Sequence, residues 1–262
     1  MGASGRGHPG TATIEALYRY PVKGLTPEPL ESVELTPLQT LPFDRHYAIE
    51  NGPGPFDPAN PQHLQKIHFV MLMRNEELAT VRSLFDDATE TLVISKSGVE
   101  IARGDLRTEA GRATIEDAVA RIVTSGLRGR PRVVVSPGHS FSDVAPKCIH
   151  LVNRRSLSAL EAMLGVPLDA RRFRPNLVVD GLDAWSELDL VGRKLRTGGI
   201  TLEIFKRTER CAATNVDPET GVRDLKIPSF LSKTLGHTDF GVYARILDGG
   251  RIRVGDTLEV ID

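Results

Sequence analysis

The feature of this sequence that most constrains its fold is a series of short apolar segments joined by turns that contain glycine. Alternating or β-branched apolar residues predict strands, and glycine beside Asn, Asp or Ser marks the turns. The predicted strands are residues 13–20, 30–36, 46–51, 132–136, 148–153, 176–181, 192–209, 240–250 and 253–262, with a hairpin over 91–103. No strand–helix–strand alternation runs along the chain. We therefore expect a mainly β fold with some α structure and a barrel-like architecture.

Four further segments have the spacing or the capping residues of helices, namely residues 75–88, 114–126, 156–165 and 228–236. In the first, apolar residues recur at helical spacing. Thr114 and Ser156 are the candidate N-caps of the second and third, because a side-chain oxygen there can accept a backbone hydrogen bond. Gly165 is the expected terminator of the third helix.

Length and charge limit the classes of protein to consider. The chain has 262 residues and a net charge of −1, which fits one large or two ordinary domains and gives no general attraction for nucleic acid. No apolar run approaches the roughly 18 residues of a membrane helix, so no membrane segment is expected. Residues 1–12 lack the apolar core of a secretory signal and are interpreted as a flexible leader.

The two cysteines, Cys148 and Cys211, limit the metal and redox chemistry. They cannot form a disulfide framework, their spacing is not that of a zinc motif, and two thiols cannot ligate an iron–sulfur cluster. A reducing compartment is the default for such a chain, so we expect a cytoplasmic protein. Cys148 opens an apolar strand and is interpreted as a buried filler.

Cys211 has a different sequence environment. It follows Arg210 and precedes a polar loop rather than core residues. A fixed positive charge favours the thiolate, and a thiolate is the soft ligand that heavy transition metals prefer. Cys211 is therefore a candidate metal ligand and catalytic residue. The alternative is a small buried filler at the end of a strand.

Four basic residues lie where predicted strands end, namely Lys23, Arg45, Arg174 and Arg210. Strand ends gather at the rims of a barrel, so these side chains could together clamp an anionic cofactor, arginine in bidentate fashion and lysine as a point charge. Taken singly, each is more simply explained as a solvated cation. Pro175 predicts extended backbone at Arg174.

The polar loop after the second cysteine predicts a tight turn stabilised by Asp217. Asp217 could also order Arg210 or a water near the thiolate, and this catalytic role and a purely structural one both remain open. His139 and Asp143 could line the rim of a barrel. His150 is expected to be structural rather than a metal ligand.

Together these residues resemble the MOSC family, named after the molybdenum-cofactor sulfurase C-terminal domain, with its associated N-terminal β-barrel domain. The resemblance rests on Arg-Phe-Arg-Pro-Asn followed by Cys-x-x-Thr-x-Val-Asp-Pro-x-Thr-Gly. The matching segments are residues 17–25, 41–51, 170–187 and 209–224. The resemblance implies a MOSC-type β-barrel over residues 127–262, packed with an N-terminal β-barrel or α+β domain over residues 12–126.

The resemblance implies a bound molybdenum cofactor, a molybdopterin whose metal takes Cys211 as a ligand. It also implies that Lys23, Arg45 and Arg174 hold the pterin and its phosphate. Arg210 is expected beside the metal.

Four further residues acquire roles from the resemblance. Arg155 and Ser156 match the start of a helix that contributes polar contacts in relatives, and a helix N-terminus suits a phosphate. Asn176 is expected to orient its turn or a pterin edge. Relatives often carry serine where Gly24 stands, so a backbone N–H is expected to replace that hydroxyl contact.

The resemblance to amidoxime-reducing components and related bacterial proteins implies an oxidoreductase that reduces N-oxygenated (N-hydroxylated) small molecules. The chain lacks the cysteines for an iron–sulfur cluster and the room for a pyridoxal-phosphate domain. Electrons are therefore expected from a separate ferredoxin- or cytochrome-type protein with its reductase. Two alternatives remain open: a non-catalytic carrier or storage protein for the cofactor, and a structural barrel with an inactive site.

Overall fold

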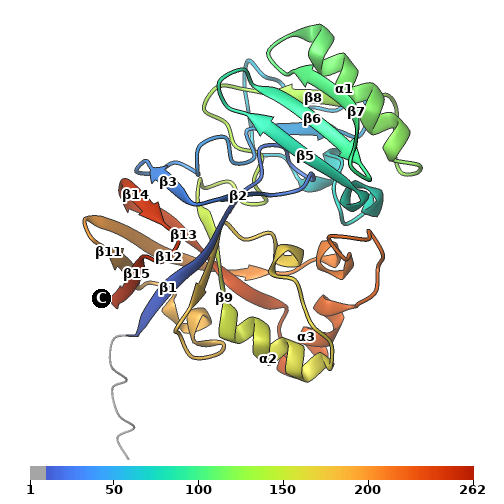
Figure 1. Cartoon of the computed structure of the whole chain (residues 1–262). Coiled ribbons are helices and arrows are strands. Elements are labelled where there is room, and N and C mark those ends of the chain that lie inside the picture. Colours follow the sequence, from blue (N-terminus) through green and yellow to red (C-terminus); the bar gives the residue numbers. More distant parts are fainter. Residues whose placement is uncertain (1–9) are drawn as a thin grey trace, which may run out of the picture.

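The computed structural model describes residues 10–262 and shows a closed β-barrel beneath a smaller lobe (Figure 1). The strands of the barrel, in order around it, are β10 (Leu177–Asp180), β9 (Ile149–Asn153), β13 (Asp239–Asp248), β12 (Ile200–Glu209), β11 (Lys194–Thr197), β15 (Thr257–Ile261) and β1 (Thr11–Arg19). Pairing of β1 with β10 closes the barrel, and β2 (Glu28–Leu30) extends β1. The expected mainly β, barrel-like fold is confirmed.

Alternation of buried and exposed side chains explains why these segments form the barrel. Ile14 and Leu17 of β1 point into one core with Leu202 and Ala244 of the two longest strands. These two strands, β12 and β13, carry register shifts along their pairing. Such bulges bend a strand, which allows the pair to wrap around the barrel. A small sheet, β3 (Ser32–Leu35) with β14 (Gly250–Arg253), adds to the same core.

The smaller lobe has its own core between two sheets and one helix, at the top of Figure 1. Its strands are β4 (Tyr47–Glu50), β5 (Val81–Asp86), β6 (Thr91–Lys96), β7 (Val99–Asp105) and β8 (Arg132–Val135). The helix α1 (Glu109–Ile122) packs against β7 and β8. The predicted hairpin over residues 91–103 is β6 and β7, which confirms it.

The predicted helix over residues 75–88 is wrong. This segment forms a short 3-10 helix, η2 (Glu76–Thr80), followed by the strand β5. Val81 and Phe85 are buried whereas Leu84 is 66% exposed, so apolar positions that fit helical spacing also fit one face of a strand. The pairing of β5 with β6 along its whole length decides in favour of the strand.

The helix expected over residues 114–126 exists but begins earlier. Thr108 is the N-cap of α1, and its side chain accepts a hydrogen bond from the Gly111 N–H. Thr114, the expected N-cap, lies inside the helix and donates to the Ala110 carbonyl. The helix therefore begins five residues before the predicted start, at Glu109, and it ends at Ile122.

The helix α2 (Arg154–Leu164) is capped by Asn153, not by the expected Ser156. The predicted terminator is confirmed, because Gly165 adopts a left-handed conformation with φ of 73°. The last α-helix is α3 (Ile227–Leu235), as expected for residues 228–236. The other short 3-10 helices are η1 (Lys66–His68), η3 (Ala170–Phe173), η4 (Ser186–Leu190) and η5 (Ala212–Asn215).

The strand β1 belongs to the barrel although the sequence assigns it to the first domain. It pairs with β15 on one side and with β10 on the other. The division between residues 126 and 127 stays a prediction, and β1, which lies within the first expected domain, pairs with strands of the second. Residues 1–9 of the predicted leader lie outside the described residues. Among residues 10–262, no helix is long and apolar enough to cross a membrane.

Candidate functional site

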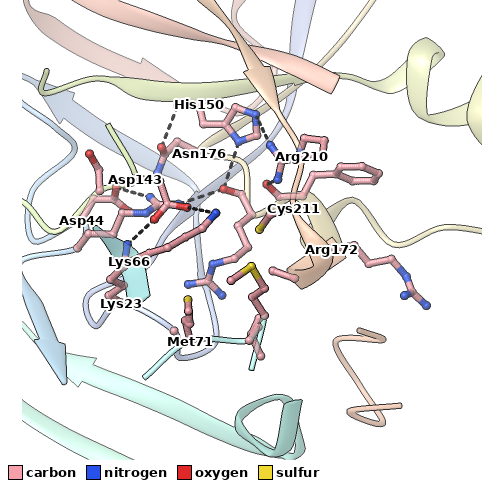
Figure 2. Close-up of a pocket in the computed structure, with 18 of the residues that line it drawn as sticks. Lys23, Asp44, Lys66, Met71, Asp143, His150, Arg172, Asn176, Arg210 and Cys211 are labelled. Carbon is pink, nitrogen blue, oxygen red and sulfur yellow. Dashed lines mark hydrogen bonds and ion pairs between the residues drawn. The ribbon is translucent and has the colours of Figure 1, made fainter. Parts of the chain in front are cut away.

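A pocket lies where the barrel meets the smaller lobe, and both contribute to its walls (Figure 2). It comprises about 820 Å³, part of which is open to solvent. Its lining residues come from the segments 23–24, 44–45, 66–73, 142–150, 172–176 and 210–213 and from Tyr243. Seven residues for which the sequence predicts a role in catalysis or cofactor binding line this pocket, namely Lys23, Gly24, Arg45, Arg174, Asn176, Arg210 and Cys211.

Lys23 is held at the pocket wall by two acceptors. Its Nζ donates to the Phe141 carbonyl at 2.8 Å and to the Asp143 carboxylate at 2.5 Å. Burial lowers the pKa of Lys23, and the negative charge of Asp143 opposes that effect. Partial burial alone would raise the pKa of Asp143, but the charge of Lys23 and its hydrogen bond hold that pKa well below its usual range. Asp143 is therefore ionised at neutral pH.

Gly24 follows in a conformation that other residues rarely adopt, with φ of +88°. A Cβ atom at this position would lie 2.8 Å from the backbone oxygen of Val70. A serine therefore does not fit this backbone without a shift of the neighbouring segment. The expectation that the Gly24 N–H replaces a hydroxyl contact stays a prediction.

Arg45 and Arg174 share one aromatic ring. Their guanidinium carbons lie 4.6 Å and 4.2 Å from the centroid of the buried Tyr20 ring. At these distances the face of the ring attracts both cations. Arg45 also donates to Asp44 and to the Arg174 carbonyl, and Arg174 donates to the Leu25 carbonyl. Burial lowers the pKa of Arg174 to about 10, so it remains a cation at neutral pH.

The backbone at Arg174 is not extended, as Pro175 had suggested. Arg174 has φ of 53° and ψ of 50°, in the left-handed region, and it ends the short helix η3. Arg45 has a similar positive φ of 52°. Such conformations cost energy and persist only where the surroundings fix them, and they concentrate at binding sites. Two of the pocket arginines therefore have constrained backbones.

Arg210 directly follows β12, and other groups of the protein hold its side chain. Its Nη2 donates to the Phe173 carbonyl at 2.6 Å, and its Nη1 lies 3.3 Å from His150 Nε2. Burial lowers the pKa of Arg210, while Tyr243 and Cys211 oppose that effect. Among the described residues, its buried Nε has no hydrogen-bond partner. A buried donor without an acceptor is costly, which suits a site that receives an anion.

Cys211 is half-buried at the pocket wall rather than packed into a core, so the filler interpretation is wrong. It precedes η5, and its carbonyl accepts the Thr214 N–H. Figure 2 shows its sulfur beside the Arg210 side chain and facing the pocket. Cys148 lines the same pocket but is buried, as predicted, and burial raises the pKa of its thiol to about 12.

Two predicted contact residues lie elsewhere. Ser156 is fully buried, where its hydroxyl donates to Glu187 and accepts the Trp185 N–H. Arg155 is exposed and faces Asp180 and another surface acid. Neither residue lines the pocket. The structure therefore does not bring the start of this helix together with the other expected contact residues.

Asp217 stabilises its own turn rather than Arg210. Its Oδ1 accepts the Glu219 and Thr220 N–H groups, and its Oδ2 accepts from Arg172. Asp217 does not line the pocket, and its contacts are those of the structural alternative. The catalytic alternative stays a prediction. Figure 2 shows Arg172 turned away from the other labelled cations.

Asn176 is buried, and backbone groups occupy its amide. Its Oδ1 accepts the His150 N–H at 3.0 Å and its Nδ2 donates to the Tyr18 carbonyl at 3.1 Å. It therefore orients its turn, which is the first of its two expected roles.

The sequence did not identify Lys66, Tyr243 or the contact of His150 with the arginines as parts of the pocket. The sequence analysis named Asp143 and His139 as residues that could line the rim of the barrel. Asp143 lines the pocket, whereas the His139 ring packs against the Phe141 ring.

Comparison with known proteins gives the family. Residues 11–130 match the family described as the MOSC N-terminal beta barrel domain, and residues 137–259 match the MOSC domain. The chain is similar to mitochondrial amidoxime-reducing component 1 of Homo sapiens, 25% identical over 287 residues that cover 95% of this chain and 83% of the relative.

Mitochondrial amidoxime reducing component 2 of Rattus norvegicus is 31% identical over 180 residues, which cover 61% of this chain. The chain spans about half the length of that relative, 51%. Among solved structures, the YUAD protein of Bacillus subtilis is 14% identical with a TM-score of 0.45 over 95% of each chain. The family matches together extend over nearly the whole described chain, and the chain belongs to the MOSC family, with a MOSC N-terminal domain preceding the MOSC domain.

Proposed function

We propose that this chain is a molybdenum-cofactor-dependent oxidoreductase that reduces N-hydroxylated small molecules, with Cys211 as the ligand of the metal. The observation that carries the proposal is one half-buried thiol beside a pocket that gathers Lys23, Arg45, Arg174 and Arg210. The names of the curated relatives, amidoxime-reducing components, support the reaction class.

The residues present fit such a cofactor. A molybdopterin carries a phosphate, and the pocket wall holds six basic residues, the four named above with Lys66 and Arg172, against two carboxylates, Asp44 and Asp143. Arg210 is adjacent to Cys211 in the chain, and among the described residues its buried Nε has no hydrogen-bond partner. A positive charge at this position favours an anionic ligand near the metal. When bound, the cofactor supplies two electrons, which with two protons convert an N–OH group to N–H and water.

Each residue of the chain has a defined task in this proposal. Cys211 holds the metal, and Arg210 places a positive charge beside it. Lys23, Arg45 and Arg174 bind the phosphate and the pterin, because arginine and lysine both pair with phosphate oxygens. The Tyr20 ring keeps Arg45 and Arg174 together despite their like charge, so that both remain available to one anion.

The electron donor in this proposal is a separate ferredoxin- or cytochrome-type protein with its reductase. The names of the curated relatives, which call them amidoxime-reducing components, support a reductase that works with other proteins. The cytoplasmic localisation expected from the sequence stays a prediction, and the curated relatives carry mitochondrial names.

The test is turnover by the full chain isolated with its cofactor from a host that makes it. Molybdenum is measured per chain, and an aromatic amidoxime is offered with a reduced viologen dye as electron donor. We expect amidine formation by the wild type, loss of at least 100-fold in Cys211→Ala, and wild-type rates in the surface variant Arg155→Ala.

A fully loaded sample without turnover on amidoximes and hydroxylamines contradicts the reductase. If that sample instead passes its cofactor to an apo-molybdoenzyme, the protein is a carrier. Full activity in Cys211→Ala contradicts the assignment of the metal ligand.

A further inference from the structure

His150 lies between the arginines of the pocket, although its place in a barrel strand gave no reason to expect this. Its ring is buried on β9, 5.4 Å between centroids from the Tyr243 ring on the neighbouring strand. Nε2 lies 3.3 Å from Arg210 Nη1, and Nδ1 lies 3.4 Å from the Arg174 carbonyl oxygen. Arg45 donates to the same carbonyl at 3.2 Å. One imidazole thus joins the thiol side of the pocket to the side with the other two arginines.

The chemistry of these partners determines which nitrogen of His150 carries the proton. A guanidinium has only donors, so Nε2 must accept from Arg210. A carbonyl only accepts, so Nδ1 must donate to Arg174. Only the neutral imidazole with its proton on Nδ1 satisfies both contacts, because a charged ring has no lone pair to offer Arg210.

The surroundings of the ring also favour the neutral form. Burial lowers the pKa of His150 well below its ordinary value, and the charge of Arg210 adds to this, while the Arg174 and Phe240 carbonyls oppose it. The position itself is fixed. A Cβ at Gly241, which has φ of +78°, would lie 2.8 Å from His150 Nε2. Glycine at that position leaves the space that the imidazole uses.

We propose that His150 is a positioning residue, a neutral acceptor that holds the Arg210 guanidinium toward Cys211 and links it to the backbone turn of Arg174. Arg210 then has both terminal nitrogens bound to the protein, one by the Phe173 carbonyl and one by His150. Its orientation is fixed before any anion enters. The role in catalysis rests on the proposed function, but the role in anion binding does not.

The first test measures the proton on His150 directly. In the apo full chain, ¹⁵N-detected imidazole correlations at pH 7 should show a neutral ring with the proton on Nδ1. A charged ring, or a proton on Nε2, overturns the proposal, since neither form can accept from Arg210.

The second test uses inorganic pyrophosphate as an anion probe for the apo full chain. We expect His150→Leu to weaken its binding, measured by calorimetry, by about tenfold, the loss expected when a hydrogen bond to a charged group disappears. His150→Gln, whose side-chain oxygen can accept from Arg210, should recover affinity to within about threefold. Arg155→Ala, outside the pocket, should bind like the wild type. Thermal unfolding of every variant shows that the chain is folded.

The outcomes separate this inference from the proposed function. Equal weakening in the Leu and Gln variants, or none in either, contradicts positioning through a hydrogen bond. If the affinities follow the prediction but the loaded enzyme does not turn over, the positioning role of His150 stands and the proposed reductase activity is contradicted. In an active enzyme, His150→Leu should lower kcat more than it raises KM, and His150→Gln should recover most of kcat.

Discussion

Gly24 occupies a position in the pocket wall that only glycine fits. Both its φ of +88° and the 2.8 Å approach of a Cβ to the Val70 oxygen oppose a side chain. We predict that Gly24→Ser lowers the free energy of unfolding by about 2–3 kcal/mol, as expected for a strained backbone position with a clash. Denaturant unfolding measures this loss.

Gly138 provides the matched control for that substitution. It also has a positive φ, +71°, but no atom lies within 4 Å of its virtual Cβ. Gly138→Ser should therefore cost only the backbone strain, about 1 kcal/mol. Equal losses in the two variants would show that the close contact at Gly24 is not important.

Asp143 gives the pocket a pH dependence. Its pKa is depressed in the folded chain by Lys23, so it stabilises the fold above the unfolded pKa of about 3.9, and this stability is lost as pH falls through the folded value. Asp143→Asn should therefore lower the melting temperature at pH 7, and the difference from the wild type should shrink below about pH 4.

The control for Asp143 is an exposed carboxylate of the same type. Asp180 faces Arg155 at the surface, and such pairs contribute little to stability. Asp180→Asn should leave the melting temperature nearly unchanged at every pH. A difference between Asp143→Asn and the wild type that stays constant down to pH 2 contradicts the assigned cause.

The sequence could predict single residues of the pocket only where they carry a motif. Lys23, Arg45, Arg174, Arg210 and Cys211 lie in family motifs at strand ends, and the structure brings all five to one pocket. By contrast, the contacts of His150 depend on which side chains the barrel closure places on either side of it. Spacing along one strand contains no information on those neighbours.

At the scale of single elements, the start of α1 separates two threonines that look equivalent in the sequence. Thr108 caps the helix, whereas Thr114 lies within its second turn. We predict that Thr108→Ala lowers the free energy of unfolding by about 1 kcal/mol. Thr114→Ala should change it by less than about 0.5 kcal/mol, because alanine has the higher helix propensity. Similar losses of stability in both variants would contradict the assignment of Thr108 as the N-cap of α1.

The mistaken helix over residues 75–88 shows why periodicity alone could not decide between helix and strand. The helical spacing of Leu78, Val81 and Phe85 was satisfied by a short 3-10 turn followed by a strand. The decisive contacts are with β6, whose pairing is not visible within the window of residues that sets the period. The end of α2 at Gly165 was predicted correctly, because a glycine terminator is a local signal, although the N-cap of the same helix was not.

At the scale of the whole molecule, β1 ties the two ends of the chain together. It fills the gap between β10 and β15, where Thr11 pairs with Glu259 and Leu17 with Leu177. We predict that residues 127–262 expressed alone do not form a cooperative fold, because the barrel lacks one strand and its core is open. Thermal unfolding of this fragment should show no sharp transition, and the fragment should aggregate during purification.

A permuted fragment provides the control. Residues 127–262 followed by a short flexible linker and residues 10–30 restore β1 beside β15, since the two strands are antiparallel neighbours. This fragment should recover a cooperative transition. If residues 127–262 alone already unfold cooperatively, the second domain is independent of β1 and the division after residue 126 is sufficient.

The position of β1 also dictates when the pocket can exist during synthesis. The ribosome makes Lys23 and Arg45 early, but β1, which precedes them, pairs with β15 at residues 257–261, encoded more than 200 codons later. A nascent chain therefore cannot complete this pocket before β15 has been made. Any group that binds there does so only after residue 261 has been added to the chain.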